Sequence, residues 1–126
     1  MMERFTLFSA DAAKVFLDRE SDIGLIAHNL TCEVEVIKES GRYRFGKAYF
    51  SATNLIGPKT IVRAFIEVLG DVVKAQSHSL FVRNLNPQYA SSTLTLSRAV
   101  LTSVSVGQNV GELAIAALAA GEWVVN

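Results

Sequence analysis

One mostly apolar run, residues 58–76 (PKTIVRAFIEVLGDVVKAQ), constrains the fold more than any other part of this sequence. Read as a helix, the run gathers its polar residues into one narrow stripe and leaves the remaining helix surface apolar. It is also rich in β-branched residues, which are mediocre helix formers, so tertiary packing must hold it. We therefore expect one long helix over 58–76, buried on more than one side, with a buried pair of strands as the alternative.

Other segments carry the period-two pattern of strands. Residues 30–37 alternate between apolar and polar side chains, and a turn at 39–41 separates them from residues 42–51, which predicts a hairpin. Residues 79–83 predict a short strand, and residues 93–106 predict a long strand that bends midway. We expect these strands to form one antiparallel sheet.

The two ends of the chain predict helices. Ser9 is a suitable N-cap followed by apolar residues at helical spacing, so we expect a short N-terminal helix over residues 10–18. The C-terminal segment 110–120 is apolar and rich in alanine, which favours a second helix ending at Gly121. A final pair of strands, forming a hairpin, is the alternative for this tail.

Together these elements predict a single α+β domain over residues 1–126. Its antiparallel β-sheet would pack around the long apolar helix 58–76, with a short N-terminal helix and a C-terminal Ala-rich helix or hairpin. A long apolar helix cradled by an antiparallel sheet is the arrangement of the hotdog fold. This is an architectural analogy, because no family motif accompanies it, and a fold does not determine a function.

Charge and composition narrow the classes of partner. The 12 Lys and Arg residues balance the 12 Asp and Glu residues, so the formal net charge is zero. General nucleic-acid binders and polybasic membrane anchors need surplus cations, so we expect neither nucleic acid nor membrane as a partner. No stretch approaches the roughly twenty apolar residues of a membrane span, and the first residues lack the features of a secretory signal, which favours a cytoplasmic location. The single cysteine, Cys32, is expected to be a buried, inert thiol.

Recognisable motifs for catalysis or metal binding are absent from the sequence. Phosphate-binding loops, dinucleotide-binding glycine patterns and nucleophile elbows do not occur. The two histidines, His28 and His78, have no partner at metal-ligand spacing. We therefore expect no metal and no cofactor.

The best candidates for acid–base chemistry are Glu67 and Asp71, which would lie one helical turn apart on the expected helix. His78 follows the helix and is the third candidate catalytic residue. If the helix is buried, the repulsion between the two carboxylates would prepare one of them to act as an acid or base. Neutralisation by Arg63, Lys74 and solvent is the alternative.

A polar ligand would most readily meet Arg83 and Asn84, after the short strand, or Arg98, which interrupts an apolar strand face. Turn formation accounts equally well for Asn84. A buried Arg98 would need a carboxylate partner, for which Glu67 and Asp71 are available. The small-molecule ligand itself stays unknown.

Two functions fit these features. The first is a small self-associating, non-enzymatic protein: a structural, assembly or regulatory subunit that acts through protein–protein contacts. It would form a homo-oligomer, most commonly a symmetric dimer, through the tail 110–126 and the exposed face of the long strand. The alternative is a hotdog-like thioester hydrolase or dehydratase with Glu67 or Asp71 on the central helix as its acid or base. The lack of a catalytic constellation favours the first.

Overall fold

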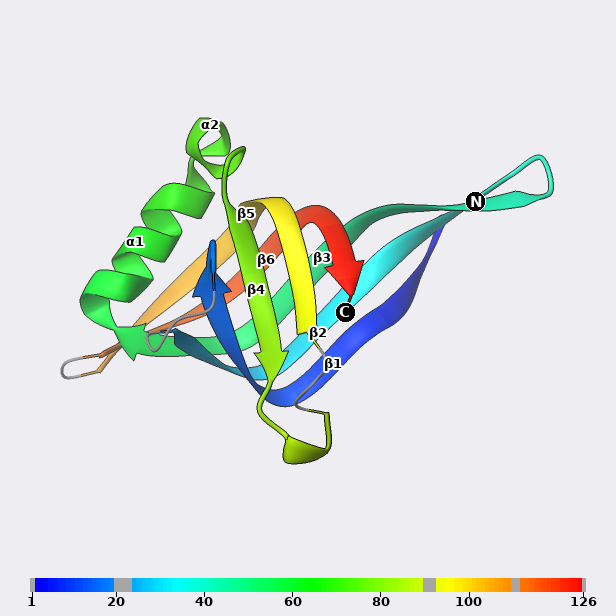
Figure 1. Ribbon diagram of the computed structural model, residues 1–126. Coiled ribbons are helices and arrows are strands. Elements are labelled where there is room, and N and C mark those ends of the chain that lie inside the picture. Colours follow the sequence, from blue (N-terminus) through cyan, green and yellow to red (C-terminus); the bar gives the residue numbers. More distant parts are fainter. Residues whose placement is uncertain (1, 20–23, 90–92, 110–111, 126) are drawn as a thin grey trace.

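Six antiparallel strands form a single sheet that closes into a barrel, and two short helices cover one part of it (Figure 1). The computed structural model describes residues 2–19, 24–89, 93–109 and 112–125. The strands follow the order β1-β2-β3-β6-β5-β4, and pairing between β4 and β1 closes the ring. Their bounds are β1 (Met2–Leu17), β2 (Leu25–Glu39), β3 (Arg42–Pro58), β4 (Ser79–Asn84), β5 (Thr93–Asn109) and β6 (Glu112–Val125). The helices are α1 (Lys59–Gly70) and α2 (Val72–Ala75), and a 3₁₀ turn spans Pro87–Tyr89.

Alternation along the strands builds the core. In β2, β3 and β4 buried residues alternate with more exposed ones, as expected for strands with one face inside a barrel and one outside. The largest fully buried side chains come from all six strands and from α1. They are Phe50, Leu25, Leu30, Leu55, Leu69, Leu80, Leu94, Leu96, Ile115, Val15, Val62 and Val82. One apolar core therefore joins the barrel interior to the helix that covers it.

The prediction of a long central helix over 58–76 is wrong. Helix α1 ends at Gly70, Asp71 has an extended backbone with φ −102° and ψ 111°, and α2 adds only one further turn. Helix α1 contacts β3, β5 and β6. It lies on the side where β5 continues past Ser97, beyond the start of β4 at Ser79, and has no described strand as its neighbour. The helix covers an opening in the sheet, so the predicted α+β arrangement, a sheet packed around a helix, is replaced by an antiparallel barrel.

Only one stripe of α1 is buried. Val62, Phe65 and Leu69 lie three and four residues apart and point into the core. Ile66 and Val68, beside this stripe, are half-buried and pack against the edge of the core. The wide apolar surface of this segment predicted more burial than α1 has. Apolar residues are also common at the rim of a contact and on the protein surface, so an apolar side chain need not be buried.

The predicted N-terminal helix over residues 10–18 is also wrong, because residues 10–17 belong to strand β1. Strand β1 pairs with β2 from Met2 to Val15 and with β4 from Ala13 to Leu17. The backbone hydrogen bonds to β2 and β4 stabilise the strand more than the capping residue Ser9 and the helical spacing of the apolar residues would stabilise a helix. Local propensity is only a weak guide to secondary structure.

The Ala-rich tail forms neither a second helix nor a hairpin of two final strands. It is the single strand β6, which pairs with β3 on one edge and with β5 on the other. Ile115, Ala117 and Ala119 are buried in the barrel. The helix propensity of alanine is overridden because both neighbouring strands offer unpaired backbone groups, and a buried unpaired group is costly.

The predictions from strand periodicity are confirmed. Segments 30–37 and 42–51 form the β2–β3 hairpin, segment 79–83 lies in β4, and segment 93–106 lies in β5. Strand β5 bends where its register with β6 shifts, between Ser97 and Val100 and again between Leu101 and Ser103. The predicted turn at 39–41 closes the hairpin, and its Ser40 and Gly41 have φ values of 51° and 78°. Two successive positive φ angles in a two-residue loop are typical of a type I′ turn, which matches the twist of the strands.

Gly121→Ala is expected to destabilise the barrel by about 1–3 kcal/mol, the usual cost of forcing an extra methyl group into a packed site. A Cβ at position 121 would lie 2.8 Å from the carbonyl oxygen of Ser97 and 3.2 Å from the Cα of Ala99. Both neighbours are backbone atoms of the bent part of β5, so they cannot rotate away. Urea unfolding of the purified variant measures the loss.

Gly70→Ala is the matched control, because a Cβ at position 70 meets no atom within 4 Å. Alanine is a better helix former than glycine, so this variant should be as stable as the native chain or up to about 1 kcal/mol more stable. Equal stability of the two variants would contradict the close approach of β6 and β5.

Candidate interaction surface

Three strands continue beyond the barrel and form a projecting arm, seen at the right of Figure 1. We define the arm as residues 2–6 of β1, 34–39 of β2 and 42–47 of β3. The pairing of β6 with β3 begins at Ala48, opposite Gly121, so no described strand pairs with the β3 edge of the arm. A strand without a neighbour on one side exposes its backbone N–H and C=O groups, and a second chain can pair with these groups.

Two bulges mark the root of the arm. The β1–β2 register shifts between Thr6 and Phe8, and the β2–β3 register shifts between Val34 and Val36. Both shifts lie at the level where the pairing of β6 with β3 ends. Bulges bend strands and often re-aim side chains next to functional sites, so they set the angle at which the arm leaves the barrel.

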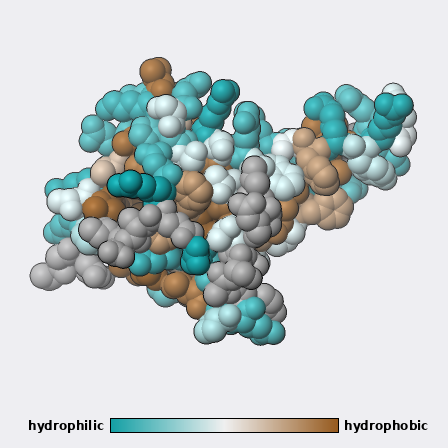
Figure 2. All heavy atoms as spheres, in the orientation of Figure 1, coloured by the Kyte–Doolittle hydropathy of each residue, from teal (hydrophilic) through white to brown (hydrophobic). Residues whose placement is uncertain are grey.

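One face of the arm is aromatic and exposed. Phe5 lies opposite Val34 and Phe45 lies opposite Val36, and directly opposite residues share a face. The exposed fractions of Phe5, Tyr43 and Phe45 are 54%, 68% and 65%. Figure 2 shows hydrophobic atoms along the arm at the right of the view, next to the hydrophilic atoms of its tip.

Trp123 holds one of these rings in place. Its ring packs edge-on against Phe45, with centroids 5.7 Å apart and planes at 85°. The indole Nε1 donates a hydrogen bond of 3.2 Å to the carbonyl oxygen of Gly46. Because the ring of Phe45 already has a fixed orientation, a partner that covers it loses little side-chain entropy.

The opposite face of the arm is polar. The hydroxyl of Tyr49 donates to Glu35, and the guanidinium of Arg4 lies 4.0 Å from the centroid of the Tyr49 ring. The hydrogen bond to Glu35 raises the pKa of Tyr49 above its ordinary value, burial adds to this rise, and Arg4 opposes it. Arg4, Glu35 and Tyr49 on the polar face are therefore engaged with one another.

The tip of the arm is basic although the whole chain has no net charge. Residues 38–47 include four cationic side chains, Lys38, Arg42, Arg44 and Lys47, and one carboxylate, Glu39. Glu39 forms an exposed ion pair with Arg44 at 3.4 Å. On the aromatic face the ammonium of Lys38 lies 5.7 Å from the centroid of the Tyr43 ring, and Glu3 lines the same hollow as these two residues. Arg42 and Arg44 alternate with Tyr43 and Phe45 and lie on the other face.

The three candidate catalytic residues have separate structural roles. Glu67 is exposed on α1 and bonds the ammonium of Lys74 at 3.3 Å. Asp71 caps α2, since its Oδ1 accepts from the N–H of Val73 at 2.9 Å and of Lys74 at 3.3 Å. The continuous buried helix that would have placed the two carboxylates on one face does not exist.

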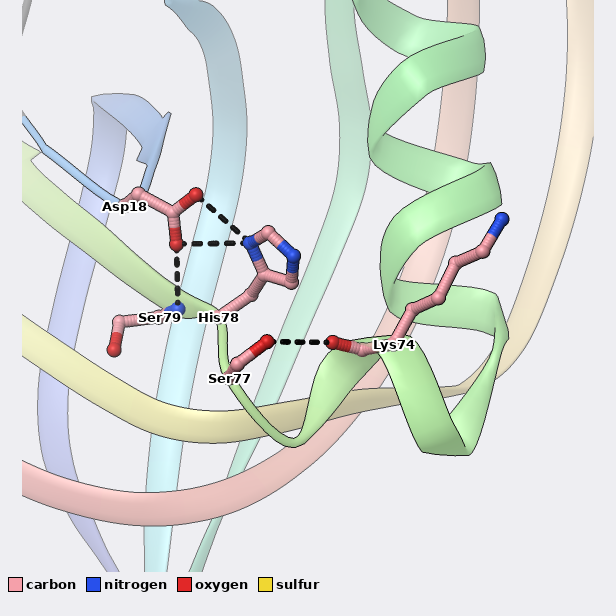
Figure 3. Close-up of polar contacts among 5 residues, drawn as sticks. All are labelled: Asp18, Lys74, Ser77, His78 and Ser79. Carbon is pink, nitrogen blue, oxygen red and sulfur yellow. Dashed lines mark hydrogen bonds and ion pairs between the residues drawn. The ribbon is translucent and has the colours of Figure 1, made fainter.

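His78 pairs with Asp18 at the start of β4 (Figure 3). Its Nδ1 lies 2.8 Å from Oδ2 of Asp18, whose Oδ1 accepts from the N–H of Ser79 at 3.1 Å. The hydroxyl of Ser77 bonds the carbonyl oxygen of Lys74 at 3.3 Å, so it is turned away from the imidazole. The pair ties the end of β1 to the start of β4, and Figure 3 draws no hydrogen bond between the imidazole and the hydroxyl of either labelled serine.

The three candidate ligand-binding residues do not converge either. Asn84 is buried, and its Oδ1 accepts a hydrogen bond of 2.9 Å from the N–H of Asn86. This bond stabilises a turn, as the alternative prediction for Asn84 expects. Arg83 and Asn84 lie at the end of β4, whereas Arg98 lies beside its start, because Ser79 pairs with Ser97. Asn84 lines one hollow of about 320 Å³, and Arg98 lines a different hollow of about 380 Å³.

Arg98 is exposed and has a φ of 52°, at the bend of β5. The bend turns its side chain out of the barrel, so the arginine that interrupts an apolar pattern needs no buried carboxylate. The expected pairing with Glu67 or Asp71 is absent from the ion pairs of the described residues.

Cys32 lies in the barrel wall with no exposed surface. Burial raises the pKa of its thiol from 9.0 to about 12, and Glu33 adds to the rise. At pH 8 the native thiol is therefore expected to react with a disulfide reagent at least ~100-fold more slowly than in the urea-unfolded chain, because the thiolate is the nucleophile. Fast native labelling would contradict its placement.

The same shift gives a direction to the pH dependence of stability. The native pKa lies above the unfolded value, so the unfolded chain releases its thiol proton first. The contribution of Cys32 is fully present below pH 9 and is lost as the pH rises towards 12. Cys32→Ser, which does not ionise in this range, is the control for this slope.

Comparisons with models of protein families, with curated proteins and with solved structures find no match for this chain. Within the described residues, no helix has the length and apolar character needed to cross a membrane. The same residues contain no group of three or more His, Cys, Asp or Glu side chains that could hold a metal ion. The geometry of the chain is therefore the basis for proposing a function. Within it, the arm extends beyond the barrel and its exposed aromatic side chains contribute little to the core.

Proposed function

We propose that this protein is a small, non-enzymatic assembly subunit that self-associates through the aromatic face of its arm. The observation that carries the proposal is the exposure of Phe5, Tyr43 and Phe45 on one face of a projecting, ordered sheet. Large exposed apolar patches on small proteins mark interaction sites. Residues 112–125 of the tail that the sequence predicts as the interface form an integral strand of the barrel, so the arm takes the place of the tail in the proposal.

The size of the aromatic face supports this function. Three aromatic side chains of about 150–250 Å² each, exposed by half to two-thirds, present about 280–470 Å². A standard interface buries about 800 Å² on each partner, of which about 450 Å² is non-polar. The arm therefore supplies most of the apolar surface that one side of such an interface requires.

The energy of covering this surface favours weak, concentration-dependent association. At about 25 cal/mol per Å², burial of the aromatic face contributes roughly 7–12 kcal/mol, against roughly 4–15 kcal/mol for the lost freedom of two molecules. The zero net charge removes general electrostatic repulsion between copies. The difference is at most about 8 kcal/mol, which corresponds to a Kd of about 1 μM or weaker, so association should depend on concentration rather than being permanent.

The hotdog-like thioester enzyme is not proposed further. Its mechanism needs a carboxylate on a central helix inside the sheet, whereas α1 covers an opening in a barrel and Glu67 is exposed. Asp71 and His78 are engaged with other partners. No observation in the described residues brings these groups to one hollow.

Sedimentation velocity over a wide range of protein concentration tests the proposal. The native chain should change from monomer to larger species as the concentration rises. The double variant Phe5→Ser/Tyr43→Ser should stay monomeric, and Leu85→Ser, which changes another exposed apolar residue, should behave as the native chain. A native chain that stays monomeric throughout would overturn the proposed function.

A further inference from the structure

The β3 side of the arm carries backbone groups that no described strand covers. Strand β3 pairs with β2 from Arg42 onward, whereas its pairing with β6 begins only at Ala48 (Figure 1). The indole of Trp123 bonds the carbonyl oxygen of Gly46, which closes the inner end of this edge. The part that remains free to receive a further strand is therefore residues 42–45, and we call it the open edge.

The register determines which backbone groups point to the open edge. Glu39 and Arg42 pair across a two-residue loop. In such a turn the N–H after the loop bonds the carbonyl before it, so the backbone of Arg42 points to β2. The direction alternates along an antiparallel strand, so Tyr43 and Phe45 direct their N–H and C=O groups to the open edge. An added strand can pair with these two residues without breaking a bond of the hairpin.

The two faces of the open edge differ in chemistry. Tyr43 and Phe45 lie on the aromatic face, and Arg42 and Arg44 alternate with them on the polar face. Arg44 forms an exposed ion pair with Glu39, and such pairs contribute little. Arg42 belongs to none of the ion pairs of the described residues. The open edge therefore offers two aromatic rings on one side and two cations on the other.

These faces select an added strand by its own alternation. Residues directly opposite each other in a sheet share a face, so side chains opposite the aromatic residues should be apolar and those opposite the arginines acidic. The added strand would lie about 4.8 Å from β3, whereas Glu39, on β2, would be about twice as far from it. The two arginines are therefore the nearest charges to the added strand on the polar face.

A second copy of this chain does not match this requirement. An antiparallel pairing of two open edges would gather four arginines on one face, and like charges across a sheet are destabilising. In the β1 strand of the arm, Glu3 and Arg4 are adjacent and so lie on opposite faces. Neither strand presents acidic residues on one face and apolar residues on the other.

We propose that the open edge binds an extended segment of a different protein, in which acidic residues alternate with apolar ones, as an added strand. The backbone of this segment bonds Tyr43 and Phe45, its apolar side chains extend the aromatic face, and its carboxylates meet the two arginines. Strand β2 has the same alternation over residues 33–36 and pairs with the other edge of β3. The contact uses the edge of the arm and does not depend on the proposed self-association.

Synthetic peptides of about eight residues, the length of an ordinary strand, test this contact. In the first peptide Glu alternates with Val, in the second Lys replaces Glu, and the third has the composition of the first without the alternation. Fluorescence anisotropy of each labelled peptide measures binding to the native chain. The alternating Glu peptide is expected to bind at least about tenfold more tightly than the other two. Equal binding of the Glu and Lys peptides would overturn the proposal.

Two variants separate the charge from the backbone. In Arg42→Gln/Arg44→Gln the preference for the Glu peptide over the Lys peptide should disappear. Tyr43→Pro removes an N–H that points to the open edge, which an edge strand tolerates. Tyr43→Thr, the matched control, also loses the ring but keeps this N–H. The proline variant is expected to bind the Glu peptide at least about tenfold more weakly than the threonine variant, and equal binding would overturn strand addition.

Amide hydrogen exchange gives the same test in the native chain, without a substitution. The Glu peptide should slow the exchange of the N–H groups of Tyr43 and Phe45. The N–H groups of Arg42 and Arg44 point to β2, so they should be protected before the peptide is added. Unchanged exchange at Tyr43 and Phe45 in the saturated complex would overturn strand addition.

The outcomes distinguish this inference from the proposed function. A native chain that self-associates and binds none of the peptides would overturn the strand partner and leave the proposed function in place. A native chain that binds the Glu peptide and never self-associates would do the reverse. Self-association that is lost in Tyr43→Pro and kept in Tyr43→Thr would assign the open edge to a second copy and overturn the acidic partner.

Discussion

Replacing residues 38–43 with Asn-Gly is expected to give a folded barrel that no longer self-associates. Ile37 lies directly opposite Arg44, so a two-residue loop can close the hairpin at this pair without changing its register. The change removes Tyr43 and two of the tip's cations, whose side chains are exposed and contribute little to the core. The concentration at which half of the protein is assembled should rise at least tenfold, a loss of about 1.4 kcal/mol or more per contact.

The matched control keeps the arm at full length. Ser40→Asn places the same Asn-Gly sequence in the native loop, where Ser40 and Gly41 already have positive φ angles. This control should fold and assemble as the native chain does. Circular dichroism and a cooperative thermal transition establish that the shortened barrel is folded. If the folded, shortened chain assembles as readily as the control, the arm is not the interface.

The elements with a purely local signal could be predicted from the sequence. The β2–β3 hairpin combines a period-two pattern with a Ser-Gly loop, and both act within a few residues of each other. Strands β4 and β5 likewise carry their own alternation. The bend in β5 was also predictable, because Arg98 interrupts the apolar face of this segment, and the structure has a positive φ at that residue.

The elements defined by distant partners could not be predicted in this way. Strand β6 is held between β5, its neighbour in sequence, and β3, whose Ala48 pairs with Gly121. The sequence of segment 110–120 shows its alanines but not these two edges. Segment 10–18 is a strand for the same reason, since β4 pairs with it from more than sixty residues away.

The candidate interaction surface depends on where a distant strand stops. Tyr43 and Phe45 have the composition of any buried strand, and their periodicity gives no sign of exposure. They are exposed because β6 begins its pairing with β3 at Ala48, beyond the arm. The basic charge of residues 38–47 was the one available signal, and the zero net charge of the whole chain concealed it.

Helix α1 gives the largest expected effect on stability. Phe65→Ala is expected to lower the free energy of unfolding by about 3–5 kcal/mol, the usual cost of truncating a buried aromatic ring. Phe65 is 3% exposed, and it already borders an apolar hollow of about 250 Å³ together with Val15 and Leu25. Removing the ring enlarges this unfilled space between the helix and the barrel. The melting temperature should fall by about 10–20 °C, measured by calorimetry.

Val73→Ala is the control for this prediction, because its side chain is 82% exposed on the neighbouring helix and its truncation should change stability by no more than about 0.5 kcal/mol. The contrast separates two roles of the helical segment that its composition does not distinguish. The buried stripe of α1 closes the barrel, whereas the exposed valine of α2 contributes little to the core. If Phe65→Ala were as mild as Val73→Ala, α1 would not be a structural part of the barrel, and its apolar stripe would be an exposed surface like that of α2.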